Sequence, residues 1–306
     1  MTYRVSHRNY LTGSLTVAAL VFNVLVATAQ PTEQEHARIA SGIDEAIKVL
    51  GTEPRLKKLS PQARRQLVEF IFRNTLFAMA HEMGHGLINE MNMPVLGREE
   101  DAADSFAIVN ALKMGSTFSE RVLEEAAKGL ALSAKRDKKE GNALAFYDEH
   151  GLDPQRAYNI VCFMYGSNPE KFKQLANNAK LPEERQKSCV YDYKNAAWSF
   201  DELLKMHLRA PDQPKIEINI KYEDSKKYSA PLRILRAVGL LDMLAEHAAN
   251  RWAWPHPHTV EARSCGMANA RWRQRTLTLC YELVDEFIEL FLGSSKSASR
   301  KLLAPR

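Results

Sequence analysis

The chain lacks several features that would place it in a common functional class. No stretch interleaves basic residues with aromatic ones, so nucleic-acid binding is not indicated despite the formal net charge of +5. No internal repeat and no long low-complexity tract is present. None of the four cysteines forms a C-x-x-C pair, which argues against a cysteine metal site. What remains is a chain of 306 residues, 45% of them hydrophobic, which is enough for one large domain or two small ones.

Long apolar runs are also missing, with one exception near the start. Residues 15–27 are mostly apolar, follow Arg4 and Arg8, and are followed by small residues up to Ala29. This layout is typical of a secretory signal, and the run is too short for a comfortable membrane span. We expect residues 1–29 to be a signal peptide, cleaved after Ala29, on a protein exported to the periplasm or secreted. An uncleaved leader that anchors the protein to the membrane is the alternative.

Export would place the four cysteines in an oxidising compartment, where disulfides form and persist. Four cysteines allow three connectivities. The pairing that closes the shortest loops joins Cys162 to Cys189 and Cys265 to Cys280. We predict this sequence-local pairing.

Hydrophobic periodicity predicts a mostly helical chain. Apolar residues recur at helical spacing, and helices are expected over residues 61–92, 98–114, from 117 onward, 154–164, 182–193, 199–207, 231–251 and 281–292. Residues 216–222 instead alternate strictly between apolar and polar, which is typical of a half-buried strand. Shorter strands are expected over residues 259–263 and 277–279. The predicted fold class is α+β, predominantly helical, with a small sheet.

One H-E-x-x-H motif, His81-Glu82-Met83-Gly84-His85, falls on a predicted helix. A helix places residues four apart on one face, so both imidazoles could bind one metal ion. Glu82 lies about 100° around the helix from His81 and could reach a water beside the metal. This geometry indicates a zinc-activated water with a carboxylate general base. A chance match on a surface helix is the alternative, but the preceding turns are apolar, and buried polar groups need partners.

Acidic residues soon after this motif offer a third ligand. The candidates are Glu99, Glu100, Asp101 and Asp104. On a helix, Glu100 and Asp104 share one face with two alanines, which would let this helix pack close to the first. Glu100 could then bind the metal, and Asp104 could accept a hydrogen bond from a ligand imidazole. The alternative is an acidic first turn that complements the helix dipole.

Together the two motifs resemble those of the gluzincin metallopeptidases, the group of thermolysin and neprilysin, in which E-x-x-x-D follows H-E-x-x-H. The resemblance implies a zincin-like fold with Glu100 as the third zinc ligand and Asp104 orienting a ligand histidine. A closer resemblance is to a bacterial family described as "putative metallopeptidases", and it rests on residues 81–88, 94–107, 155–166, 181–189 and 265–282.

A second segment carries a further resemblance. Asn269-Ala270-Arg271-Trp272 is similar to the Asn-Ala-x-aromatic segment on the edge strand of thermolysin and neprilysin. The resemblance implies that Asn269 and Ala270 bind the backbone of a peptide substrate. In those enzymes the segment precedes H-E-x-x-H, so here the C-terminal segment would have to fold back beside the active-site helix. An ordinary hairpin pinned by Cys265–Cys280 is the alternative.

The predicted activity is therefore hydrolysis of peptide bonds, with one Zn²⁺ per chain and Glu82 as general base. Of three candidate donors to the oxyanion, His150, Arg156 and Tyr158, we choose His150. The expected partners are peptide or protein substrates, without nucleic acid, and a membrane only if the leader is uncleaved. Two alternatives remain: a metal-binding protein without turnover, and a disulfide-stapled interaction protein with a chance motif.

A linker at Pro211–Pro214 is expected to divide the mature chain. Residues 30–212 would form the zincin-like catalytic region. Residues 213–306 would supply the substrate-binding edge strand and pack with the first region as one unit.

Overall fold

Helices dominate the computed structural model, which describes residues 33–302 and their side chains over residues 37–294. The described part holds ten α-helices, one short 3-10 helix and one four-stranded sheet. This confirms the predicted fold class. The elements are α1 (Glu33–Thr52), α2 (Pro61–Glu90), α3 (Glu99–Met114), α4 (Thr117–Glu140), α5 (Asp153–Ser167), α6 (Pro169–Asn178), α7 (Glu183–Leu204), η1 (Lys205–His207), β1 (Ile218–Tyr222), α8 (Ser229–Val238), α9 (Leu240–Arg251), β2 (His258–Arg263), β3 (Ala270–Arg273), β4 (Thr276–Cys280) and α10 (Tyr281–Leu302).

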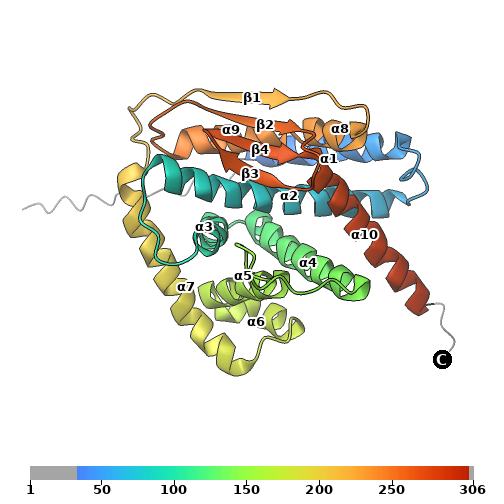
Figure 1. Cartoon of the computed structure of the whole chain (residues 1–306), viewed down its shortest axis with the longest axis horizontal. Coiled ribbons are helices and arrows are strands. Elements are labelled where there is room, and N and C mark those ends of the chain that lie inside the picture. Colours follow the sequence, from blue (N-terminus) through green and yellow to red (C-terminus); the bar gives the residue numbers. More distant parts are fainter. Residues whose placement is uncertain (1–32, 303–306) are drawn as a thin grey trace, which may run out of the picture.

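Helix α2 is the central element of the fold. It begins at Pro61, and the Ser60 hydroxyl caps it by accepting a hydrogen bond from the Ala63 amide at 3.2 Å. Residues on all its faces are buried, because α2 lies between the sheet on one side and helices α3, α4 and α5 on the other (Figure 1). Helices α1 and α10 also pack against it. A helix surrounded in this way can bury a polar site among its neighbours.

The sheet has the strand order β1-β2-β4-β3. Strands β1, β2 and β4 run parallel, whereas β3 pairs with β4 in the antiparallel sense through a tight turn at Gln274 and Arg275. Strand β3 is therefore an edge strand, and it contacts α2 together with its neighbour β4 (Figure 1). The C-terminal segment does fold back beside the helix that carries H-E-x-x-H.

Element boundaries differ from the predictions at several places, and α1 and α6 lie where no helix was expected. The helix expected over 231–251 is divided at Gly239, which adopts φ 63° and ends α8 before α9 begins. The two helices expected between 182 and 207 form the single helix α7, since no proline or glycine interrupts that stretch. Helix α4 begins at Thr117, as expected, and the Ser116 hydroxyl caps it by accepting a hydrogen bond from the Ser119 amide at 3.1 Å.

Both disulfides have the predicted sequence-local pairing. Cys162–Cys189 joins α5 to α7, and Cys265–Cys280 joins the turn after β2 to the end of β4. One hydrophobic core contains residues from both sides of the expected linker. The division of the chain at residue 212 stays a prediction.

The predicted signal peptide, residues 1–29, lies outside the described residues. Within the described part, no helix is both long and apolar enough to cross a membrane.

Candidate metal centre

A cavity of about 850 Å³ opens along one face of α2. Its floor includes His81 and Glu82 of the H-E-x-x-H motif. Its walls come from α4, from the loop that carries His150, from α10, and from Asn269 and Ala270 at the start of β3. Residues predicted from three distant parts of the sequence thus line one cavity.

Side chains of the two motifs bring their ligand atoms together beside this cavity, and His150 reaches one of them. The Nε2 atoms of His81 and His85 lie 3.2 Å apart. Glu100 Oε2 lies 3.0 Å from Nε2 of His81 and 3.3 Å from Nε2 of His85. His150 Nε2 lies 2.9 Å from the same Glu100 oxygen, so His81, Glu100 and His150 also form a compact group of possible ligands.

These separations fit a small tetrahedral metal ion. Zinc binds imidazole nitrogen and carboxylate oxygen at about 2.0 Å, which places neighbouring ligand atoms of a tetrahedron roughly 3.3 Å apart. The measured distances between His81, His85 and Glu100 are 3.0–3.3 Å. The three groups therefore have both the chemistry and the spacing for zinc.

Glycine at position 84 lets α3 approach α2 closely enough to build this cluster. A Cβ atom at Gly84 would lie only 3.1 Å from the Ala103 Cα atom of α3. The predicted alanine face of α3 thus packs against α2, where it meets a glycine that the sequence analysis did not single out. Glu100 and Asp104 lie on the first turns of α3, where this contact brings them to His81.

Carboxylates behind the histidines fix which ring nitrogens face the centre. His81 Nδ1 lies 2.8 Å from Asp104 Oδ1, and His85 Nδ1 lies 2.7 Å from Glu99 Oε1. An ionised carboxylate only accepts hydrogen bonds, so each Nδ1 carries the hydrogen. In the neutral rings both Nε2 lone pairs then converge with the Glu100 carboxylate, an arrangement that a cation stabilises.

Arg156 completes this network from α5. Its guanidinium donates to both carboxylate oxygens of Asp104, each at 2.8 Å. Burial raises the pKa of Asp104, but the bonds to Arg156 and His81 outweigh it and hold that pKa well below its usual range. Arg156, one of the candidate oxyanion donors, is therefore occupied in holding Asp104, which in turn orients His81. Its distance in sequence from both motifs left no local signal for this role.

The protein's own charges make the centre strongly attractive to a cation. Although burial raises the pKa of Glu100, hydrogen bonds from His150, His81 and His85 keep it far below its usual range. Burial lowers the pKa of His85, but Glu100 and Glu99 raise it to about 9 overall. Without a metal, protons on the imidazoles would thus balance the Glu100 charge. A divalent ion could replace those protons.

Glu82 stands apart from the possible ligands. Its side chain is buried, and its Oε2 atom accepts a hydrogen bond from the Trp272 backbone amide of β3 at 2.9 Å. Burial raises the pKa of Glu82, and His81, His85 and the Trp272 amide only partly offset this. The carboxylate is held at the cavity with a pKa shifted toward neutrality, which suits proton transfer. A Cβ atom at Gly86 would clash with the Trp272 ring at 2.7 Å, so Gly86 allows this contact.

Strand β3 presents open backbone groups beside Glu82. The Cys280 amide donates to the Asn269 carbonyl at 3.0 Å, so the Asn269 backbone pairs with β4. The backbone N–H and C=O groups of successive residues point to alternate sides of a strand. Those of Ala270 and Trp272 therefore point away from β4, toward the open edge of the sheet. There the Trp272 amide meets Glu82, and the Ala270 groups face the cavity edge.

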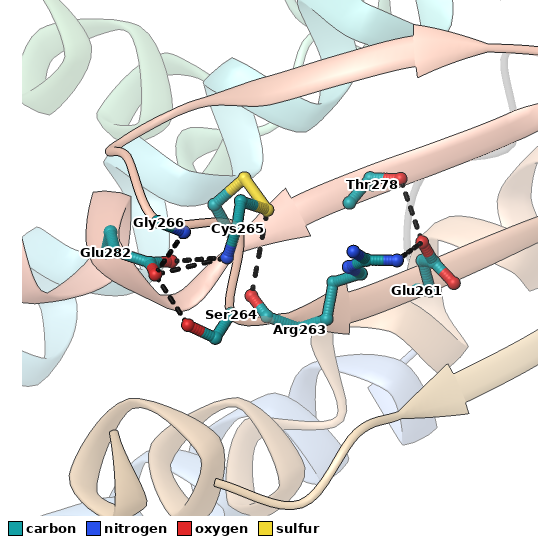
Figure 2. The surroundings of a disulfide bond; sticks show 8 residues. Glu261, Arg263, Ser264, Cys265, Gly266, Thr278 and Glu282 are labelled. Carbon is teal, nitrogen blue, oxygen red and sulfur yellow. Dashed lines mark hydrogen bonds and ion pairs between the residues drawn. A yellow bond between two sulfur atoms is a disulfide. The ribbon is translucent and has the colours of Figure 1, made fainter. Parts of the chain in front are cut away.

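The turn that leads into β3 is firmly braced (Figure 2). Glu282 accepts hydrogen bonds from the Ser264 hydroxyl at 2.6 Å, the Cys265 amide at 3.1 Å and the Gly266 amide at 2.8 Å. The disulfide from Cys265 to Cys280 ties the same turn to β4. These contacts fix the start of β3 next to the metal centre.

The helical fold and this cluster define a candidate metal site of two histidines and a glutamate, with a third histidine in reach. The family described as "Putative metallopeptidase" (DUF4344) matches residues 48–204, just over half of the chain and the part that holds every one of these groups. The chain belongs to this family. Neither a curated protein nor a solved structure matches it significantly.

Replacing Glu100 tests the third ligand. We expect Glu100→Ala to weaken zinc binding by more than about 100-fold, because the two imidazoles alone leave the ion under-coordinated. Zinc content after dialysis and chelator competition would measure this. Asp101→Ala is the matched control, since Asp101 is exposed and pairs with Arg98. Unchanged zinc affinity in Glu100→Ala would exclude Glu100 as a ligand.

Removing the Arg156 guanidinium tests the network behind His81. We expect Arg156→Gln to weaken zinc binding by roughly 10- to 100-fold, because Asp104 then holds the His81 ring less firmly. Arg98→Gln removes an exposed arginine from an ion pair and should leave zinc affinity unchanged. Equal affinities for the two variants would contradict a positioning role for Arg156. Circular dichroism would show that both variants are folded.

Proposed function

We propose that the protein is an exported zinc-dependent peptidase that hydrolyses peptide bonds in extended substrates. One observation carries this proposal: converging candidate metal ligands lie beside a cavity whose lining includes His81, a buried carboxylate outside the ligand set and residues of an edge strand. Membership of the metallopeptidase family supports the same reaction class.

The ligand chemistry favours zinc over harder ions. Magnesium and calcium prefer all-oxygen sites, whereas imidazole nitrogens with one carboxylate suit zinc. His81, His85 and Glu100 would hold the ion, and Asp104 and Glu99 would orient the imidazoles. When bound, zinc would acidify a water molecule and polarise the scissile carbonyl.

In the proposed reaction, Glu82 acts first as general base and then as general acid. Glu82 takes a proton from the attacking water and then passes it to the leaving amine. Burial raises the pKa of Glu82 above its usual value, which makes the carboxylate a better proton acceptor. The Trp272 amide holds the carboxylate in place.

His150 is the proposed donor to the oxyanion. Its ring reaches the centre from the loop before α5, and its Nε2 atom lies 2.9 Å from Glu100 Oε2. Hydrogen bonding to Glu100 raises the pKa of His150 more than burial lowers it, which favours a protonated ring that can donate. A donor there would stabilise negative charge that develops on the carbonyl oxygen.

Asn269 and Ala270 are the proposed substrate-binding residues. A peptide that pairs with the open backbone groups of Ala270 would run next to Glu82, because the following outward amide, that of Trp272, already contacts that carboxylate. Such pairing adds a strand to an open edge. With the motif spacing, this arrangement supports a gluzincin-type site in which the edge strand follows H-E-x-x-H in sequence.

Export is the proposed location, with residues 1–29 as the cleaved leader. Two disulfides and no free cysteine among the described residues support an oxidising compartment. Periplasm and extracellular space offer the same redox conditions.

Glu82→Gln separates a peptidase from a metal-binding protein without turnover. We expect hydrolysis of a peptide library to fall by roughly 10²- to 10⁴-fold, because the amide cannot accept the proton from water. Zinc content should stay at one ion per chain. Glu90→Gln is the matched control, because Glu90 ends the same helix and pairs with Arg275 outside the cavity. Peptide cleavage that survives in Glu82→Gln, or in a chelated sample, would contradict the mechanism.

His150→Ala tests the oxyanion donor. We expect turnover to fall by about 10²- to 10³-fold with zinc retained, because one donor to the developing charge is lost. Single-turnover kinetics and zinc analysis of the same preparation would measure both quantities. Loss of zinc from this variant would instead identify His150 as a fourth ligand.

A further inference from the structure

An exposed loop borders the metal centre between α4 and α5. This cleft loop, residues 142–152, contains no helix or strand. Two backbone hydrogen bonds, from the Phe146 amide to the Leu144 carbonyl and from the Asp148 amide to the Ala145 carbonyl, shape it from within. Binding and catalytic residues lie disproportionately on loops that a rigid scaffold positions.

The cleft loop exposes large apolar side chains. Phe146 is 79% exposed, Tyr147 is 93% exposed and Leu144 is 59% exposed. A single apolar residue on a surface is common and does not by itself indicate a binding site. Three such residues within four positions form a patch, and a patch of this kind marks a binding surface.

This patch continues into the cavity. Leu144 and Ala145 line the cavity, and so does His150 further along the same loop. The opposite walls are apolar as well, with Phe77 on α2, Leu130 on α4, and Leu283, Phe287 and Leu290 on α10. An apolar side chain seated in this cavity would contact apolar groups on several sides.

We propose that the cleft loop binds apolar side chains of the peptide substrate and selects peptides with bulky apolar residues next to the cleaved bond. This inference rests on the proposed function. A peptide along β3 would place alternate side chains toward the cavity and toward its rim. Leu144 and the apolar walls would take the side chain in the cavity, and Phe146 and Tyr147 would take a neighbouring one at the rim.

A double variant, Phe146→Ala with Tyr147→Ala, tests the loop directly. Both side chains are exposed, so the fold and the zinc content should not change. We expect KM to rise about ten-fold for peptides with leucine or phenylalanine at the cleaved bond, with kcat nearly unchanged, because apolar contact area is lost. Peptides with serine or glycine at those positions should show no such rise.

Tyr191→Ala with Trp198→Ala is the matched control. Both residues are exposed aromatics on α7, outside the cavity lining, so KM should not change in this variant. Equal KM values for the cleft-loop variant and the wild type would overturn the inference. A loss of self-association in that variant with unchanged KM would equally overturn it and assign the patch to contact between copies.

The inference and the proposed function fail in distinguishable ways. If the zinc-loaded wild type cleaves no peptide, the proposed function fails. Binding of a fluorescently labelled leucine-rich peptide to zinc-loaded Glu82→Gln protein then tests the loop without turnover. Weaker binding, by about ten-fold, when Phe146 and Tyr147 are also replaced supports the loop's role. Equal binding overturns it.

Discussion

The close contact between α2 and α3 is the constraint on which the candidate centre depends. Gly84 and Ala103 meet where even a Cβ atom on residue 84 would lie only 3.1 Å from the Ala103 Cα atom. Only at that separation can Glu100 reach both imidazoles while Asp104 reaches the far side of the His81 ring. A shift of one ångström would separate these atoms beyond bonding reach of a shared ion. The geometry of the site therefore depends on tight packing of these two helices.

Each carboxylate at this contact has its own partner that compensates its charge. Asp104 is neutralised by the two-fold hydrogen bond from Arg156, and the pair positions His81 without adding net charge. Glu99 contacts Nδ1 of His85 in the same way. Its carboxylate is more exposed, so solvent screens its charge. The Glu100 charge is left for the imidazoles and for a metal ion. This division leaves Glu100 as the candidate ligand, whereas Asp104 and Glu99 contact the far sides of the imidazole rings.

Local patterns predicted the parts of the site that lie on single helices. The spacing of His81 and His85, and of Glu100 and Asp104, follows from helical periodicity and needs no knowledge of the tertiary fold. Glu99 was attributed to the helix dipole, because its contact with His85 depends on how two helices cross. Arg156 and Trp272 act through contacts 52 and 190 residues away in sequence, and no local signal marks such partners. The division between α8 and α9 was likewise not predicted, because Gly239 lies within an otherwise helical pattern.

Strand β3 links two tasks that a peptidase must coordinate. Its Trp272 amide holds Glu82, and its Ala270 backbone groups lie two residues earlier on the same open edge. A peptide paired with that edge would be aligned with the base by the same rigid strand. The disulfide from Cys265 and the Glu282 contacts fix the strand's beginning, and Gly86 admits its Trp272 ring against α2 (Figure 2). In the proposed function, β3 would thus align the substrate and orient the Glu82 carboxylate, which α2 carries.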